Sequence, residues 1–162
     1  MKIPYLAALA ATVLMAAPAA PAADAPAPEF LKKGDVVPAF KATGIDGKPW
    51  DLSFPKGKST VLLFFLSSCP TCHRMLPQWN RAFERRPPGL NIVGILMDQE
   101  PPGFFAATPV AFPVARNPGK AALEPYKIAR VPITLRVGPG GKVEDIEVGI
   151  VDPIRLGEVF RP

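Results

Sequence analysis

The chain has 162 residues, of which 48% are hydrophobic and 20% charged, a composition suited to one ordinary globular domain. Its formal net charge is +5 at pH 7, but the basic residues are scattered and lack interleaved aromatic side chains. The charge therefore does not predict a nucleic-acid-binding protein. The sequence contains two cysteines and shows neither an internal repeat nor a second domain.

The first 22 residues have the layout of a secretory signal peptide. The basic residue Lys2 precedes an apolar stretch from Leu6 to Ala17. Small residues then end the segment at Ala22. The apolar core is shorter than the roughly 20 residues of a membrane-spanning helix, so we expect cleavage and export to the periplasm. An uncleaved segment would instead anchor the chain in the membrane.

Residues 23–33 form an Ala- and Pro-rich linker, and one domain is expected over 34–162. Near its start, the segment Val36–Phe40 has an extended pattern. An Asp-Gly turn at 45–48, followed by alternating residues at 50–52, predicts a β-hairpin.

The domain is organised around an unbroken apolar run, Val61–Leu66, which predicts a strand buried on both faces. The run leads through two serines into Cys69-Pro70-Thr71-Cys72, after which apolar residues recur at helical spacing. Ser68 is a favourable N-cap, and Pro70 suits the first turn of a helix. Both cysteines are therefore expected at a helix N-terminus, with Cys69 the more exposed.

This placement of the cysteines has a chemical consequence. A helix N-terminus favours a thiolate over a thiol. A thiolate attacks a disulfide, and a second thiol nearby resolves the mixed disulfide that forms. A purely structural disulfide would close so short a loop that the chain-entropy model gives at most roughly 2 kcal/mol. The pattern therefore favours a redox-active Cys69–Cys72 pair.

The rest of the chain alternates strands and helices. Pro87-Pro88-Gly89 ends the helix that follows the cysteines, and an apolar strand is predicted at Asn91–Met97, which indicates a parallel βαβ unit. Prolines between Asp98 and Val110 leave room for a short helix at most. The later elements are predicted as a strand at Phe112–Val114, a helix at Lys120–Tyr126, strands at Val131–Val137 and Val143–Ile150, and a closing helix capped by Asp152.

Together these features resemble the thioredoxin-like superfamily and, within it, the exported TlpA-like (redoxin) branch, with an active-site context similar to MauD-type proteins. The resemblance spans roughly Gly34 to Phe160. Beyond the Cys-x-x-Cys context, it is carried by Pro77 in the redox helix, by Val131-Pro132 and by a Gly-Gly-Lys turn. It implies an α/β thioredoxin-like fold, a central mixed β-sheet flanked by helices, with the N-terminal hairpin as an extension. It also implies a protein-disulfide oxidoreductase.

The resemblance further implies roles for individual residues. Cys69 would be the attacking cysteine and Cys72 the resolving one, joined as a disulfide in the oxidised state. Pro132 would be a cis-proline facing the disulfide, and Val131 would offer backbone hydrogen bonds to a substrate peptide. The residues expected to support the thiols are Pro70, Thr71 and His73.

The same resemblance sets the expected partners. These are cysteine-containing exported proteins and a membrane protein that regenerates the redox state. We expect a monomer without cofactor or metal. In two places the chain departs from thioredoxins proper: Ser68 replaces a tryptophan, and Leu63 or Phe64 stands where a buried acid is found. The sequence therefore predicts that no carboxylate lies near Cys72 to move its proton.

Two alternatives use the same residues. Cys69-Pro70-Thr71-Cys72-His73 is also the pattern of c-type haem attachment, with His73 as axial ligand and Met97 as a formal second ligand. The βαβ pattern and Val131-Pro132 have no role in a small cytochrome, which disfavours haem. Two cysteines and one histidine fall short of a closed zinc site, so a metal-binding alternative reduces to transient copper handling on the same fold.

Overall fold

The computed structural model describes residues 29–161. The predicted signal peptide, 1–22, and the first part of the predicted linker, 23–33, lie outside the described residues. Within the part that is described, no helix combines the length and the apolar character needed to cross a membrane.

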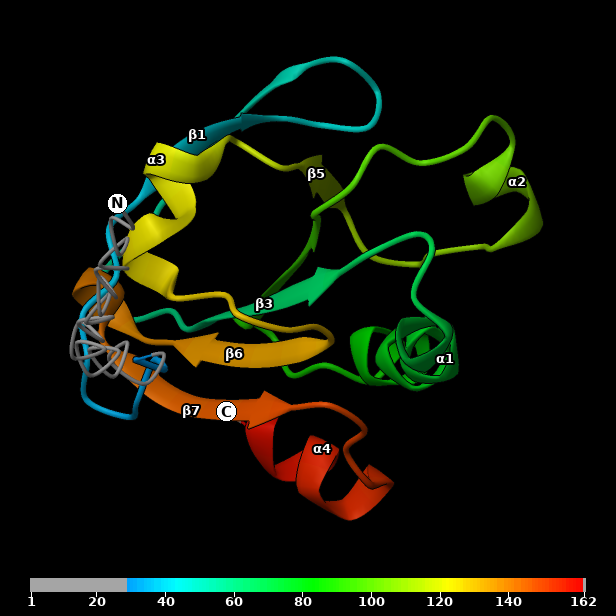
Figure 1. Ribbon diagram of the computed structural model, residues 1–162. Coiled ribbons are helices and arrows are strands. Elements are labelled where there is room, and N and C mark those ends of the chain that lie inside the picture. The colour runs from blue at the N-terminus through cyan, green and yellow to red at the C-terminus, as the bar shows by residue number, and fades with distance from the viewer. Residues whose placement is uncertain (1–28, 162) are drawn as a thin grey trace, which may run out of the picture.

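A five-stranded mixed sheet forms the centre of the fold (Figure 1). Its order is β5–β4–β3–β6–β7, with β3 (Thr60–Phe65) in the middle. β3 pairs in parallel with β4 (Asn91–Leu96) and antiparallel with β6 (Ile133–Val137). The outer strands are β5 (Val114–Arg116) and β7 (Val143–Val148). The predicted central mixed sheet is confirmed.

Helices cover both faces of this sheet. Figure 1 shows α1 (Pro70–Glu84) and α4 (Pro153–Val159) on one side of it. The other side carries α3 (Lys120–Leu123), which continues into a 3-10 turn over Glu124–Tyr126. The short α2 (Phe104–Ala107) lies in the connection between β4 and β5, as the prolines there predict.

The predicted N-terminal hairpin is confirmed. β1 (Phe40–Thr43) and β2 (Pro49–Leu52) form a two-stranded antiparallel sheet. The hairpin is fixed to the edge of the main sheet, because the Ile45 N–H donates to the Val114 carbonyl oxygen at 3.1 Å. β2 therefore stands apart from the central strands.

β3 holds the two halves of the core together. All six of its residues are at most 1% exposed. Val61, Leu63 and Phe65 pack in the cluster that includes residues of α1 and α4. Leu62 and Phe64 pack in the cluster on the opposite face. Burial of one such side chain stabilises a fold by about 1.5–3 kcal/mol, so this strand is a fixed base for the turn that follows it.

Some boundaries differ from those predicted, each for a local reason. β5 begins at Val114 and not at Phe112, because the Phe112 ring packs in the α1-side core and Pro113 has no N–H to donate. β6 begins at Ile133, after Pro132. The helix expected at Lys120–Tyr126 becomes a 3-10 turn in its second half, where Pro125 lies.

Candidate active site at the N-terminus of α1

Both cysteines lie where β3 passes into α1. Cys69 is the N-cap of α1, in an extended conformation, and its Sγ accepts a hydrogen bond from the Cys72 N–H at 3.2 Å. The expectation that Ser68 caps the helix is wrong. The Ser68 hydroxyl instead donates to the carboxylate of Asp98, at 3.2 Å. The cap is therefore a sulfur atom, which accepts a hydrogen bond from one of the N–H groups at the start of the helix.

The two thiols lie in different environments. Both are free in this structure; Cys69 is half-buried, whereas Cys72 is fully buried in the α1-side core. Burial raises the pKa of Cys72 to about 12, and hydrogen bonding to Cys69 acts in the same direction. Cys72 therefore keeps its proton at neutral pH, and Cys69 is the sulfur that a partner can reach.

A carboxylate lies close to the thiols, contrary to the expectation from sequence. Asp98 lies two residues after the end of β4, and its carboxylate accepts hydrogen bonds from the Ser67 N–H at 2.8 Å and the Ser67 hydroxyl at 2.9 Å. The Ser68 N–H and hydroxyl also donate to it, at 3.3 and 3.2 Å. These four bonds fix the turn that immediately precedes Cys69.

The charge of Asp98 acts on Cys72. Partial burial alone would raise the pKa of Asp98, but the hydrogen bonds from Ser67 and Ser68 outweigh it and place this pKa below its usual value. Asp98 is therefore ionised at neutral pH. Its negative charge adds to the effects that raise the pKa of Cys72. The buried acid is thus missing from β3, but a carboxylate on the neighbouring strand end supplies a negative charge near the site.

His73 holds the same turn from the helix side. Its Nε2 lies 2.6 Å from the Ser67 carbonyl oxygen. Because a carbonyl oxygen only accepts, Nε2 must carry the proton and donate it. The imidazole ring also lies 5.8 Å from the ring of Phe104, in α2. His73 therefore contacts both the turn before Cys69 and α2. Its position just past the cysteines lets it hold these two segments together.

The other predicted site residues differ in their exposure and in their contacts. Pro70 is exposed and Thr71 half-buried, both in the first turn of α1. The Val131–Pro132 peptide bond is cis, the geometry that the family resemblance implies. The Gly149 N–H donates to the Pro132 carbonyl oxygen at 2.8 Å, which ties this loop to the end of β7. Like Cys69, the Val131 side chain packs against the α1-side core.

The site residues do not suit either metal alternative. Among residues 29–161, no group of three or more His, Cys, Asp or Glu side chains could hold a metal ion. Thioether attachment of haem needs access to both sulfurs, whereas Cys72 is 0% exposed. His73 is engaged with the Ser67 carbonyl oxygen. The geometry therefore favours thiol chemistry at this position.

Comparison with curated proteins agrees with this chemistry. A family model described as Redoxin matches residues 32–154. Sporulation thiol-disulfide oxidoreductase A of Bacillus subtilis is 28% identical over 136 residues, which are 78% of this chain and 81% of that protein. Thiol-disulfide oxidoreductase ResA of the same species is 26% identical over 125 residues, which are 75% of this chain and 70% of that protein.

Comparison with solved structures confirms the predicted thioredoxin-like fold. StoA from Bacillus subtilis matches with a TM-score of 0.66 and 23% identity, over 76% of this chain and 97% of that chain. The exposed lipoprotein thioredoxin Etrx1 of Streptococcus pneumoniae matches with a TM-score of 0.66 and 20% identity, over 76% of this chain and 98% of that chain. At these identities the likeness is one of fold.

The Asp98 carboxylate should lower the reduction potential of the cysteine pair. In Asp98→Asn the negative charge is gone, the thiolate becomes easier to form, and the reduced state is favoured. We expect the potential to rise by about 10–30 mV, since 30 mV corresponds to about 1.4 kcal/mol for this two-electron couple. Equilibration in glutathione buffers followed by thiol counting measures it.

Glu100→Gln is the matched control, because the Glu100 carboxylate is already paired with Arg116. Its potential should stay at the wild-type value. The shift in Asp98→Asn should grow between about pH 6 and pH 8, because Asp98 is ionised across that range whereas the thiolate that its charge opposes forms more readily as the pH rises. An unchanged or lower potential in Asp98→Asn would show that the carboxylate only holds the turn.

Proposed function

The chain belongs to the redoxin family, as a TlpA-like member of the thioredoxin superfamily, and from that membership we propose an exported enzyme that exchanges a Cys69–Cys72 disulfide or dithiol with the cysteines of partner proteins. The coarser activity, that of a thiol-disulfide oxidoreductase, is shared with the curated relatives. The observation that carries the proposal is the unequal pair of thiols: one capping a helix and reachable, the other fully buried.

The proposed reaction transfers two electrons. In the reducing direction, the Cys69 thiolate attacks one sulfur of a partner disulfide, and the partner's other sulfur leaves as a thiolate. Cys72 then loses its proton and attacks Cys69 Sγ, so the Cys69–Cys72 bond forms as the mixed disulfide breaks. The partner gains two electrons and the proton that Cys72 released. The oxidising direction is the reverse of these steps.

The burial of Cys72 suits it to the second step. A thiol with a raised pKa does not compete with Cys69 for the partner disulfide. It lies next to Cys69, as the Cys72 N–H bond to Cys69 Sγ requires. Resolution therefore occurs within the protein once the mixed disulfide has formed, without a second substrate.

A partner chain would bind beside the cis-proline loop. β6 begins only at Ile133, so Val131 lies outside the sheet ladder, and its backbone is free to bond to an extended segment. Such pairing is the usual way in which an extended peptide adds to a strand end. Pro132, Pro70 and Thr71 would then border the reacting sulfurs.

Export and the identity of the partners rest on the sequence. The signal-peptide pattern at 1–22 places the domain outside the cytosol, where a disulfide can form and persist. The partners would be exported proteins with cysteines, and a membrane protein would restore the redox state. A monomer without cofactor is sufficient for this reaction.

The proposed roles, with Cys69 attacking and Cys72 resolving, can be tested by trapping mixed disulfides. Cys72→Ser should accumulate mixed disulfides through Cys69, because nothing resolves them. Cys69→Ser should accumulate none, since the remaining thiol is buried and protonated. Non-reducing electrophoresis of each variant after acid quenching, with the double variant as control, measures the adducts. Equal trapping by both single variants would refute the assignment.

Export predicts a shortened chain in the periplasmic fraction. N-terminal sequencing of the full-length gene product should begin just after Ala22, where the small residues end the apolar segment. Recovery of a chain that still starts at Met1 in the membrane fraction would establish an anchored form. Recovery from the cytosol would contradict export itself.

A further inference from the structure

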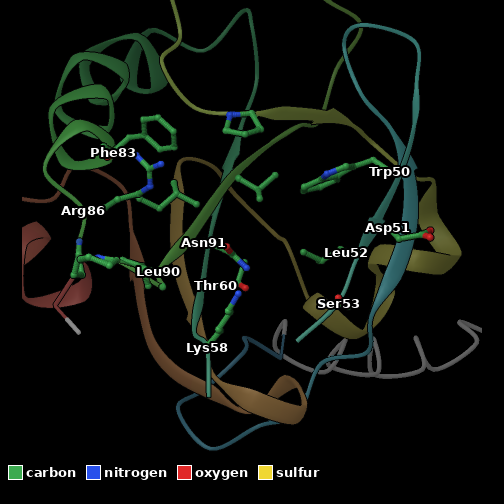
Figure 2. A pocket seen from close by; sticks show the side chains of 16 residues that line it. Trp50, Asp51, Leu52, Ser53, Lys58, Thr60, Phe83, Arg86, Leu90 and Asn91 are labelled. Carbon is green, nitrogen blue, oxygen red and sulfur yellow. Dashed lines mark hydrogen bonds between the residues drawn. The ribbon is translucent and has the colours of Figure 1, made fainter. Parts of the chain in front are cut away.

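A cavity lies at the opposite end of β3 from the thiols. It has a volume of about 710 Å³, and Figure 2 shows it between β2 on one side and the start of β4 on the other. It is open because β5 pairs only with Gly94–Leu96, which leaves the first half of β4 without a neighbour on that edge. Thr60 lies on its wall at the start of β3, whereas Cys69 follows the end of that strand. No step of the proposed thiol exchange uses this cavity.

The Thr60 hydroxyl is the first indication of a ligand there. Thr60 is 1% exposed, and its Oγ1 has no hydrogen-bond partner among the described residues. A buried hydroxyl without a partner is costly, and such groups are rare in folded proteins. Because Oγ1 itself is buried in this structure, a ligand with a polar atom at the floor of the cavity would give this hydroxyl its partner after a turn about the Thr60 Cα–Cβ bond.

The rim of the cavity is rich in cationic and donor groups. Lys58 and Arg86 both line it. The Arg86 guanidinium carbon lies 3.8 Å from the centre of the Phe83 ring, which holds the charge beside an aromatic face at the edge of the cavity. The one acidic residue of the lining, Asp51, points away from the cavity in Figure 2. The positive charge of the rim is therefore not neutralised from within.

The rest of the wall is largely apolar. Trp50 and Leu52 contribute from β2, and Leu90 lies on the opposite side in Figure 2. Val93 lines the cavity from β4. A concave site with apolar walls and a few polar groups is typical of small-molecule sites, whose volumes run from about 300 to 1,000 Å³. The two cationic side chains of the rim, Lys58 and Arg86, favour a ligand that carries a negative charge.

We propose that this cavity binds a small organic anion, a carboxylate carried on an aromatic or apolar body. The body lies between Trp50 and the start of β4, and the carboxylate lies at the rim near Lys58 and Arg86. A polar atom of the ligand accepts the Thr60 hydroxyl hydrogen. This site is independent of the cysteines and of the proposed thiol exchange.

The test uses 1-naphthoate as the probe, with the neutral 1-naphthamide as its matched control, in two-dimensional ¹H–¹⁵N NMR of the purified protein. The chain has two tryptophans. The Trp50 indole N–H lines the cavity, whereas the Trp79 indole N–H is buried and donates to the Thr134 hydroxyl at 3.0 Å. Naphthoate should shift the Trp50 indole signal and leave the Trp79 signal in place. Naphthamide should bind at least fivefold more weakly, roughly the loss of one charge-assisted bond.

Three variants test the polar contacts. Thr60→Val keeps the shape of the side chain and should weaken naphthoate binding about fivefold, the value of one hydrogen bond. It should not lower the midpoint of thermal unfolding, because the hydroxyl has no partner to lose. Lys58→Gln and Arg86→Gln together should weaken binding about tenfold. Lys56→Gln, a nearby exposed lysine outside the lining, should leave binding unchanged.

Several results would overturn the proposal. One is a Trp50 signal that does not move at millimolar naphthoate. Others are equal binding of naphthoate and naphthamide, and wild-type affinity in Thr60→Val with the fold intact. A further contradicting result is a blocked acidic tetrapeptide that shifts the Trp50 signal at lower concentration than naphthoate does. That result would mean that the cavity binds a protein segment and not a small anion.

Discussion

The turn between β3 and α1 is the constraint on which the chemistry of this protein depends. One end of the turn is set by a strand that is buried on both faces, and the other by a helix that Cys69 caps, with the Cys72 N–H donating to Cys69 Sγ. Between them, two serines could adopt several conformations. The Asp98 carboxylate removes that freedom by accepting four hydrogen bonds from Ser67 and Ser68, and His73 adds a bond to the Ser67 carbonyl oxygen. The position of Cys69 follows from these contacts.

The same arrangement makes the two thiols unequal. The helix N-terminus stabilises negative charge on Cys69 Sγ, while the core around Cys72 opposes it. Asp98 adds a negative charge close by, so the residue that fixes the turn also disfavours the Cys72 thiolate. The Asp98 side chain thus affects both the position of Cys69 and the charge near the two thiols. This chain combines the two effects in one residue just after the end of β4.

The sequence predicts the elements that depend on local pattern. The apolar run before the cysteines, the hairpin turn and the Asp152 cap of α4 are each set by neighbouring residues, and each is confirmed. Asp98 was missed because its partners lie about 30 positions earlier in the chain. A charged residue just after a parallel strand, beside the end of the next strand, was the available signal. The cavity beside β2 also cannot be predicted from local sequence pattern, because it results from where β5 stops pairing with β4.

The measurement that tests the unequal thiols most directly is alkylation of the reduced native protein by iodoacetamide as a function of pH, with the modified residues assigned by mass spectrometry. Cys69 should be the one modified cysteine throughout the neutral and mildly alkaline range. Cys72 should react only when the protein is unfolded or when the pH approaches about 12. Equal modification of Cys69 and Cys72 in the folded protein near neutral pH would contradict the proposed inequality of the two thiols.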